Sequence, residues 1–318
     1  MPSPPHLPPA LRGQPFRLLD ARRHGLSADS LRSGRFRRVL RSVYVGADVP
    51  DTLGLRLAAA RLVLPESAVF SHQTAAQVMH LPIPGVGVPP LHVTLPRHVS
   101  RRAVAGVVTH QSSAVPARNF DGFPVTTPER TFLDLAGQLS LVDLTILADA
   151  MVRRGFTTTK ALADVTGSAT GRRGIVLARK VAALARPRVD SPMETRVRLL
   201  IVLAGLPSPD PGSPVLDDDG QWVATVDLRY RAQRIAIEYD GELHHKLRGK
   251  WRRDLTTRDL LRELGWRVIV LTSEDIFHSP HLTLLRIRDA LVARGHPVVP
   301  AELDHSWETH LLPRSLAA

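Results

Sequence analysis

The stretch that decides the fold is TVDLRYRAQRIAIEYDGELH, residues 225–244. It predicts two short strands joined by a polar turn at 231–233. The first strand carries an acid, Asp227, and the second is apolar until it reaches Glu238 and Asp240. A hairpin centred on that turn sets Asp227 and Glu238 on one face as a diagonal cross-strand pair, about 7–8 Å apart. Both carboxylates can then bind one cation, which offsets the cost of burying their charge.

The composition describes a globular protein large enough for more than one domain. The chain has 318 residues, of which 43% are hydrophobic. It has no cysteine, which excludes disulfides and thiolate metal sites, so any metal must bind oxygen or nitrogen ligands. No apolar run approaches the roughly 20 residues of a membrane-spanning helix, and the proline-rich start lacks the apolar core of a signal peptide. We therefore expect a soluble, cytoplasmic protein.

The charge balance points to a polyanionic partner. Lysine and arginine number 42 against 30 acidic residues, which gives a formal net charge of +12 and an isoelectric point near 11.1. Such a charge favours nucleic acid first and an anionic membrane second. A basic surface without a partner is the alternative, because composition alone does not separate the two. We take DNA as the expected partner and expect no membrane partner.

Changes in composition and pattern along the chain predict five segments. Residues 1–14 form a disordered lead, residues 15–50 a winged helix-turn-helix, and residues 51–186 a mixed α/β middle region. Residues 187–296 form the domain that contains the hairpin, and residues 297–318 a loosely ordered tail. The order helix, strand, strand, helix, strand, helix in the fourth segment is typical of an α/β sandwich, so the chain is expected to be of the α/β class.

The N-terminal segment has the layout of a winged helix. A short helix over 16–21 is followed by a second helix over 28–32, for which Ser27 is a suitable N-cap, and then by a strand-like ribbon over 35–46. One helix of such a unit enters the major groove of DNA. The ribbon carries four arginines that we expect to bind DNA: Arg35, Arg37, Arg38 and Arg41. The alternative is a small helical cap whose arginines are only solvated.

The same segment resembles a family of antitoxins. The progression Gly-Leu-Ser, leucine, Gly-Arg, basic, Val-Tyr over 25–44 is similar to the N-terminal winged-helix domain of AbiEi-type antitoxins of type IV toxin-antitoxin systems. The stretches Ser-His at 71–72 and Thr-Pro-Glu-Arg-Thr at 127–131 also resemble those proteins. The resemblance implies a DNA-binding regulator whose partner is a cognate toxin. We interpret His72 as a packed or capping histidine, because no acid or nucleophile stands at a telling spacing from it.

The C-terminal segment carries a second resemblance. Its residues follow one another in the order Glu194, Asp227, Glu238-Tyr239-Asp240-Gly241, His244, Asp254 with Arg258, and Gly265-Trp266-Arg267-Val268. This order resembles the domain of unknown function 559 family, whose members are similar to the very-short-patch-repair endonuclease and have the restriction-endonuclease-like PD-(D/E)XK fold. The resemblance implies a metal-dependent DNA endonuclease, a hydrolase of phosphodiester bonds. In it Asp227 and Glu238 hold Mg²⁺, or Mn²⁺ in its place, and Glu194 adds a ligand.

One position departs from that family's pattern. The lysine usual in the nuclease motif falls at Asp240, and an extra acid repels the phosphate. His244 can take over proton transfer, because a reference pKa of about 6.5 suits a base near neutral pH. Very-short-patch-repair enzymes also rely on histidine instead of that lysine. The predicted catalytic residues are therefore Asp227, Glu238, Asp240 and His244.

Structural alternatives accompany two of these assignments. Glu194 stands three residues after Ser191, with proline next to the serine, which is the pattern of a helix capping box. Asp254 and Arg258 are predicted to support the site, and they are also spaced as an i, i+4 surface ion pair. Two functions follow. The first is a DNA-binding protein with a Mg²⁺-dependent endonuclease-like domain, and the second is an antitoxin-type DNA-binding transcriptional regulator whose nuclease fold is inactive.

Overall fold

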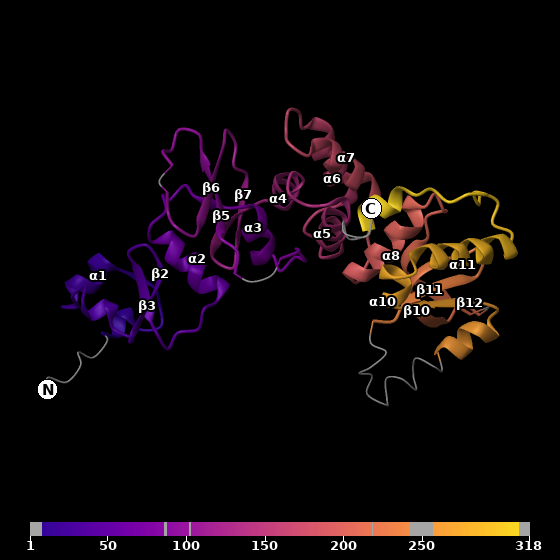
Figure 1. Ribbon diagram of the computed structural model, residues 1–318, viewed down its shortest axis with the longest axis horizontal. Helices are drawn as coiled ribbons and strands as arrows, with labels where there is room; N and C mark the ends of the chain where they lie inside the picture. Colours follow the sequence, from indigo (N-terminus) through magenta and orange to yellow (C-terminus); the bar gives the residue numbers. More distant parts are fainter. Residues whose placement is uncertain (1–7, 86–87, 102, 218, 242–256, 312–318) are drawn as a thin grey trace. The chain divides into compact units, whose positions relative to one another are not determined.

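The chain forms two compact units, Met1–Asp134 (unit 1) and Leu135–Ala318 (unit 2), in this computed structural model. The structure describes residues 8–85, 88–101, 103–217, 219–241 and 257–311. Both units combine helices with antiparallel or mixed sheets, which confirms the predicted α/β class (Figure 1). Among the described residues, no helix has both the length and the apolar character that crossing a membrane requires.

Unit 1 begins with a small antiparallel sheet. Its order is β1-β3-β2, from β1 (Phe16–Arg17), β3 (Val43–Gly46) and β2 (Phe36–Leu40), and helix α1 (Leu18–Arg23) follows β1 directly. Its buried core consists of Leu11, Phe16, Ala21, Leu26 and Leu31. Removal of these apolar side chains from water stabilises an otherwise short set of elements.

This part of unit 1 is more ordered and less helical than predicted. The predicted disordered lead extends too far, because Leu11, in the short 3-10 helix Pro9–Leu11, is only 4% exposed and belongs to the core. The predicted second helix is reduced to the 3-10 turn Ser30–Arg32. The N-cap of this turn is Asp29 instead of the predicted Ser27, although Ser27 Oγ accepts a hydrogen bond from the Ser30 N–H at 3.0 Å.

A five-stranded mixed sheet forms the rest of unit 1. Its order is β6-β5-β4-β8-β7, from β6 (Val107–Ser112), β5 (Leu91–Pro96), β4 (Val69–Phe70), β8 (Phe123–Thr126) and β7 (Ala117–Phe120). Strands β5 and β6 are parallel, as are β4 and β8, whereas the other two pairs are antiparallel. The helices are α2 (Leu53–Arg61), α3 (His72–Val78) and α4 (Pro128–Leu135). Helix α3 starts directly after β4 and packs against β5 and β8.

Unit 2 is built on a four-stranded sheet. Its order is β12-β11-β10-β9, from β12 (Arg267–Leu271), β11 (Ile235–Tyr239), β10 (Trp222–Tyr230) and β9 (Asp210–Leu216). Strands β11 and β12 are parallel and the other pairs are antiparallel. Helix α8 (Pro192–Leu203) lies against β10, β11 and α11 (Pro280–Ala293), and α10 (Ser273–Phe277) joins β12 to α11.

Three further helices belong to unit 2: α5 (Leu141–Arg153), α6 (Thr159–Ser168) and α7 (Ile175–Leu184). The division therefore lies between Asp134 and Leu135, rather than near residue 186 as predicted. Helices α5 and α8 are joined by an ion pair of 2.6 Å between Asp149 Oδ2 and Arg198 Nη2, which are both buried.

Part of the predicted tail is also ordered. Helix α12 (Ser306–Leu311) packs against α8 and α5, and Trp307 is only 2% exposed. Ser306 Oγ donates a hydrogen bond to the Leu203 carbonyl at 2.8 Å, at the end of α8. The prediction of a loosely ordered tail is therefore wrong for residues 297–311, because the apolar residues of α12 are buried there.

Candidate functional site

The hairpin of β10 and β11 brings two acids opposite each other. In its register Leu228 pairs with Ile237, and the next position along sets Asp227 opposite Glu238. The predicted diagonal arrangement is therefore wrong. The turn takes four residues, 231–234, instead of three, and this extra residue changes which positions face each other.

Asp227 is half-buried, and its carboxylate is fixed beside the end of β11. Its Oδ2 accepts a hydrogen bond from the Tyr239 N–H at 2.8 Å. Despite this bond, burial and next the charge of Glu238 raise the pKa of Asp227 to about 6. A carboxylate in this position gains from any nearby positive charge, because the cation favours the ionised form.

Glu194 is buried in the first turn of α8, with 6% of the residue exposed. The Glu194 N–H donates to Ser191 Oγ at 3.2 Å, and Glu194 Oε2 accepts from the Asp190 N–H at 2.8 Å. Half of the predicted capping box is thus present, while the returning bond goes to Asp190 instead of Ser191. Burial raises the pKa of Glu194 to about 7, and the charge of Asp227 contributes to the rise. The two acids therefore share one electrostatic environment.

A guanidinium group lies between the other two acids. Arg258 Nε is 3.4 Å from Glu238 Oε2, and Arg258 Nη2 is 3.2 Å from Asp240 Oδ2. The three side chains are between 13% and 21% exposed, so water screens these ion pairs only in part. Arg258 therefore contacts both acids. The predicted partners His244 and Asp254 lie outside the described residues, and their roles stay predictions.

The acids line a cavity of about 350 Å³. Its wall includes Asp227, Glu238, Asp240 and Arg258. Trp222 lines the same cavity and is 65% exposed. An exposed indole beside such a cavity offers a stacking surface for a nucleic-acid base. The sequence gives one signal for Trp222, its position at the start of the first hairpin strand.

The donors around the cavity fit a magnesium ion. Asp227, Glu238 and Asp240 offer only carboxylate oxygens, the hard ligands that Mg²⁺ prefers. Glu194 is close enough for the charge of Asp227 to raise its pKa. Arg258 contacts two of these acids, so a cation must compete with the guanidinium for them.

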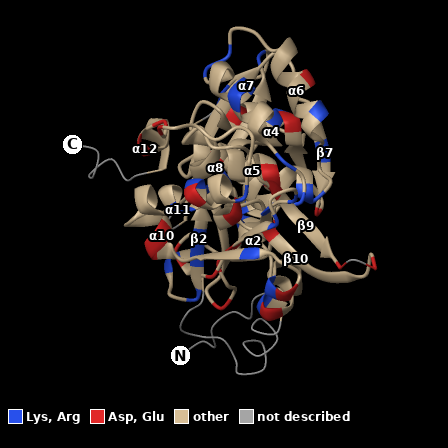
Figure 2. Cartoon of the chain, turned by 90° about the vertical axis from the view of Figure 1, so that its right-hand side faces the viewer, with Lys and Arg blue, Asp and Glu red and all other residues tan. Residues whose placement is uncertain are grey.

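The four arginines of the N-terminal ribbon differ in their environment. Arg37 is half-buried. Its guanidinium contacts Asp51 Oδ1 at 3.3 Å and donates to the Val49 carbonyl at 3.0 Å. The other three are exposed: Arg35, Arg38 and Arg41. Arg38 stands on the opposite face of β2 from Arg37, because side chains alternate along a strand. Elsewhere basic and acidic residues are interspersed over the elements, so the net positive charge is spread along the chain (Figure 2).

Comparison with known proteins gives relatives without a described function. Two proteins of Mycobacterium tuberculosis, MT2308 and Rv2248, are each 30% identical to this chain over 258 residues, and both are described as uncharacterized. The match covers 81% of this chain and 93% of each of theirs. The crystal structure of the RV2827C protein from Mycobacterium tuberculosis has a TM-score of 0.38 and 14% identity, covering 65% of this chain and 85% of that one. No protein-family model matches the chain.

Proposed function

We propose that this chain, which belongs to the same family as the Mycobacterium tuberculosis proteins MT2308 and Rv2248, is a DNA-binding protein with a Mg²⁺-dependent endonuclease-like site in unit 2. The observation that carries the proposal is the meeting of Asp227, Glu238 and Asp240 at one cavity. Acids gathered in this way, with the pKa of Asp227 raised to about 6, are typical of sites that bind a cation or move protons.

In this proposal the acids hold the ion, and the rest of the cavity holds the nucleic acid. Asp227 and Glu238 would bind Mg²⁺, with Glu194 contributing from α8. When bound, the ion neutralises the phosphate and makes a coordinated water more acidic. Arg258, once displaced from its two acids, can form paired hydrogen bonds to a phosphate, which is the recognition that a guanidinium performs best. It would thus supply the cationic group that Asp240 does not.

The basic ribbon of unit 1 would deliver the protein to DNA. Arg35, Arg38 and Arg41 are exposed and can reach phosphates. The resemblance to AbiEi-type antitoxins supports this role, and the resemblance of unit 2 to the domain of unknown function 559 family supports a restriction-endonuclease-like fold there. We also propose a cytoplasmic location, with which a chain free of cysteine agrees.

The contacts of Arg258 favour a second candidate function. If the guanidinium is a permanent partner of Glu238 and Asp240, the acids are neutralised within the protein and need no cation. Asp240, at the position where the nuclease motif has lysine, also favours an inactive site. Unit 2 would then be an inactive scaffold, and the chain an antitoxin-type DNA-binding regulator with a cognate toxin as partner.

Cleavage assays separate the two functions. Full-length protein is incubated with supercoiled plasmid or single-stranded DNA in Mg²⁺, Mn²⁺ or EDTA, and strand breaks are counted. The nuclease requires metal-dependent breaks that Asp227→Asn abolishes. The control is Asp259→Asn, which removes an acid that is 63% exposed and paired with Arg262 on the same helix as Arg258. DNA binding without breaks in any condition, and no effect of either ion on the melting temperature, would leave the regulator.

A further inference from the structure

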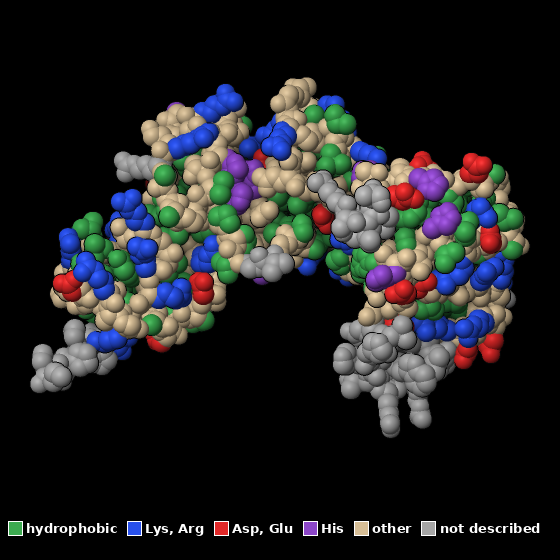
Figure 3. Space-filling view, in the orientation of Figure 1, with side chains coloured by type: hydrophobic (Ala, Val, Ile, Leu, Met, Phe, Trp, Pro, Cys, Tyr) green, Lys and Arg blue, Asp and Glu red, His purple; other side chains and the backbone are tan. Residues whose placement is uncertain are grey.

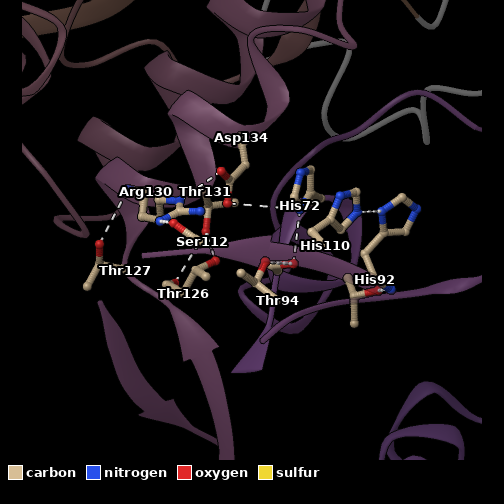
Figure 4. Close-up of polar contacts among 12 residues, drawn as sticks. His72, His92, Thr94, His110, Ser112, Thr126, Thr127, Arg130, Thr131 and Asp134 are labelled. Atoms are coloured by element: carbon tan, nitrogen blue, oxygen red, sulfur yellow. Dashed lines mark hydrogen bonds and ion pairs between the residues drawn. The ribbon is translucent and has the colours of Figure 1, made fainter. Parts of the chain in front are cut away.

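Three histidines of unit 1 form a group at the edge of its mixed sheet (Figure 4). His92 lies on β5, His110 on the neighbouring strand β6, and His72 is the first residue of α3. If one ring nitrogen is taken from each histidine, the three nitrogens all lie within 4.8 Å of one another. The backbone holds them there, since Thr94 of β5 pairs with His110 and the Ser71 N–H donates to the His92 carbonyl at 2.9 Å.

The rings are close enough to share one ion. His92 Nδ1 and His110 Nε2 are 3.0 Å apart. Two nitrogens bound to the same tetrahedral Zn²⁺, each about 2.0–2.1 Å from it, lie about 3.4 Å from each other. The His72 ring stacks on the His110 ring, with centroids 3.7 Å apart and planes 18° apart. An ion shared by all three rings therefore requires two small changes. The His92 and His110 nitrogens move apart by a few tenths of an ångström, and the His72 ring turns out of its stack, because the lone pairs of parallel rings do not converge on one point.

A hydroxyl and a carboxylate stand behind the His72 ring. Its Nδ1 is 3.0 Å from Ser71 Oγ. The same nitrogen is 3.9 Å from Asp134 Oδ2 (Figure 4). Asp134 is held in turn by Arg130, whose Nε donates to Asp134 Oδ1 at 2.8 Å and whose Nη1 donates to the Ala114 carbonyl at 2.6 Å. Metal-bound histidines commonly direct their second ring nitrogen at such groups, which fixes the tautomer. The tautomer that donates from Nδ1 to these oxygens has its acceptor lone pair on Nε2, and this is the form that metal binding requires.

The group is sheltered but open to solvent on one side. His72 and His92 are 7% and 9% exposed, while His110 is half-buried, and histidine side chains are visible at the surface of unit 1 (Figure 3). Burial lowers the pKa of both His92 and His110, which favours the neutral form of each ring. The sequence did not reveal the group, because common zinc motifs have ligands only about 2–5 residues apart. Here the topology of three elements brings the histidines together.

We propose that unit 1 binds one divalent transition-metal ion through His72, His92 and His110. Three imidazole ligands suit Zn²⁺ and leave a fourth tetrahedral position for water or an anionic ligand. The site is built from nitrogen donors, whereas the cavity of unit 2 offers carboxylate oxygens. It therefore selects softer ions than Mg²⁺ and does not depend on the function proposed for unit 2.

Zinc binding by the full-length protein tests this site. Protein stripped with EDTA and then dialysed is titrated with Zn²⁺ by calorimetry, and its melting temperature is recorded with and without the ion. We expect one tightly bound ion per chain and a higher melting temperature in its presence. Because losing even an outer partner of a metal ligand costs about 10- to 100-fold in affinity, His92→Gln and His110→Gln should each cost at least that much. His98→Gln, which changes an exposed histidine of the same unit, should have no effect.

Two further measurements keep the test decisive. Far-UV circular dichroism of the stripped variants shows whether they fold. If they do not, X-ray absorption of the zinc-loaded wild type decides, because the proposal requires imidazole nitrogens at about 2.0–2.1 Å from the metal. An oxygen-only shell, no bound zinc, or equal zinc affinity in folded histidine variants would overturn the proposal. Loss of zinc only in Asp227→Asn would place the ion in unit 2 and overturn it as well.

Discussion

Arg258 and Asp240 form an ion pair at the end of β11, with 3.2 Å between Nη2 and Oδ2. The same guanidinium is 3.4 Å from Glu238 Oε2. If unit 2 has the proposed endonuclease-like fold, position 240 is where the nuclease motif usually has a lysine. Here a cationic side chain reaches that place from the helical residues 257–263 instead. Among the described residues that line the cavity, Arg258 is the one cationic side chain.

Removal of this arginine should expose the repulsion among the acids. We expect Arg258→Gln to lower the free energy of unfolding in EDTA by about 1–2 kcal/mol, because hydrogen bonds to charged groups contribute about 1.5–3 kcal/mol and water screens these pairs in part. Mg²⁺ should then raise the melting temperature more in the variant than in the wild type, because it no longer competes with the guanidinium. Thermal melts with and without the ion measure both effects.

Arg262→Gln is the matched control for this experiment. Arg262 pairs with Asp259 at 2.9 Å on the same helix, but both side chains are more than 60% exposed. Its loss should change stability by no more than about 0.5 kcal/mol and leave the response to Mg²⁺ unchanged. An equal response to Mg²⁺ in wild type and Arg258→Gln would show that the ion does not bind these acids.

The stability of the EDTA-treated protein should fall as the pH rises from about 4 to about 7. Burial raises the pKa of Asp227 from 3.8 to about 6 and that of Glu194 from 4.5 to about 7. Between these values the folded chain keeps both protons and the unfolded chain has released them, so raising the pH favours unfolding. Below about pH 4 both states are protonated, and above about pH 7 both are ionised, so these two groups add no further slope.

The variant Asp227→Asn isolates one part of this pH dependence. It should flatten the fall in stability and leave the variant up to about 3 kcal/mol more stable than the wild type at pH 8 without metal, since a pKa raised by two units corresponds to that free energy. Urea unfolding at pH 4, 6 and 8 gives both curves. Parallel curves for the two proteins would mean that Asp227 ionises as freely in the folded chain as in the unfolded one.

The buried pair Asp149–Arg198 should be essential to unit 2. Asp149 Oδ2 also accepts from the Thr195 hydroxyl at 2.9 Å, and Asp149 Oδ1 accepts from the Arg186 N–H at 2.7 Å. Asp149→Ala leaves the guanidinium buried without its carboxylate, which should cost about 3–5 kcal/mol. Asp164→Ala removes a pair that is more than 60% exposed on both sides and should cost at most about 0.5 kcal/mol. Similar denaturation midpoints for the two variants would contradict this account.

Local patterns in the sequence predicted the helix and the hairpin of the site, but not their exact pairing. Ser191 followed by proline sets the start of α8, and the apolar run before Glu238 sets β11. The register of the hairpin was predicted wrongly because the turn has four residues, and local polarity does not determine the length of a turn. Strand β9 was not predicted because Pro211 and Pro214 interrupt its alternating pattern. Its place at the edge of the sheet allows these prolines, which a central strand does not tolerate.

Contacts between distant residues were harder to predict. The spacing of Asp254 and Arg258 suggested a pair along one helix, whereas Arg258 meets acids on β11 and just beyond it. His72 stood without a partner in the sequence, and only the neighbouring strands β5 and β6 bring two more histidines to it. Sequence spacing shows partners within one element. Partners across a sheet depend on strand order, which the sequence did not reveal.

The exposed arginines of the ribbon should set the salt dependence of DNA binding, and Arg37 should not. Each lost phosphate contact lowers the slope of log K against log salt by about 0.9, so the double variant Arg38→Gln, Arg41→Gln should lower it by about 1.8. Arg37→Gln should leave the slope nearly unchanged, because Asp51 and the Val49 carbonyl already hold that guanidinium. Binding of the full-length protein to labelled duplex DNA over a range of salt concentrations gives the three slopes. A loss of slope in Arg37→Gln alone, with the double variant unaffected, would place the DNA on the other face of β2.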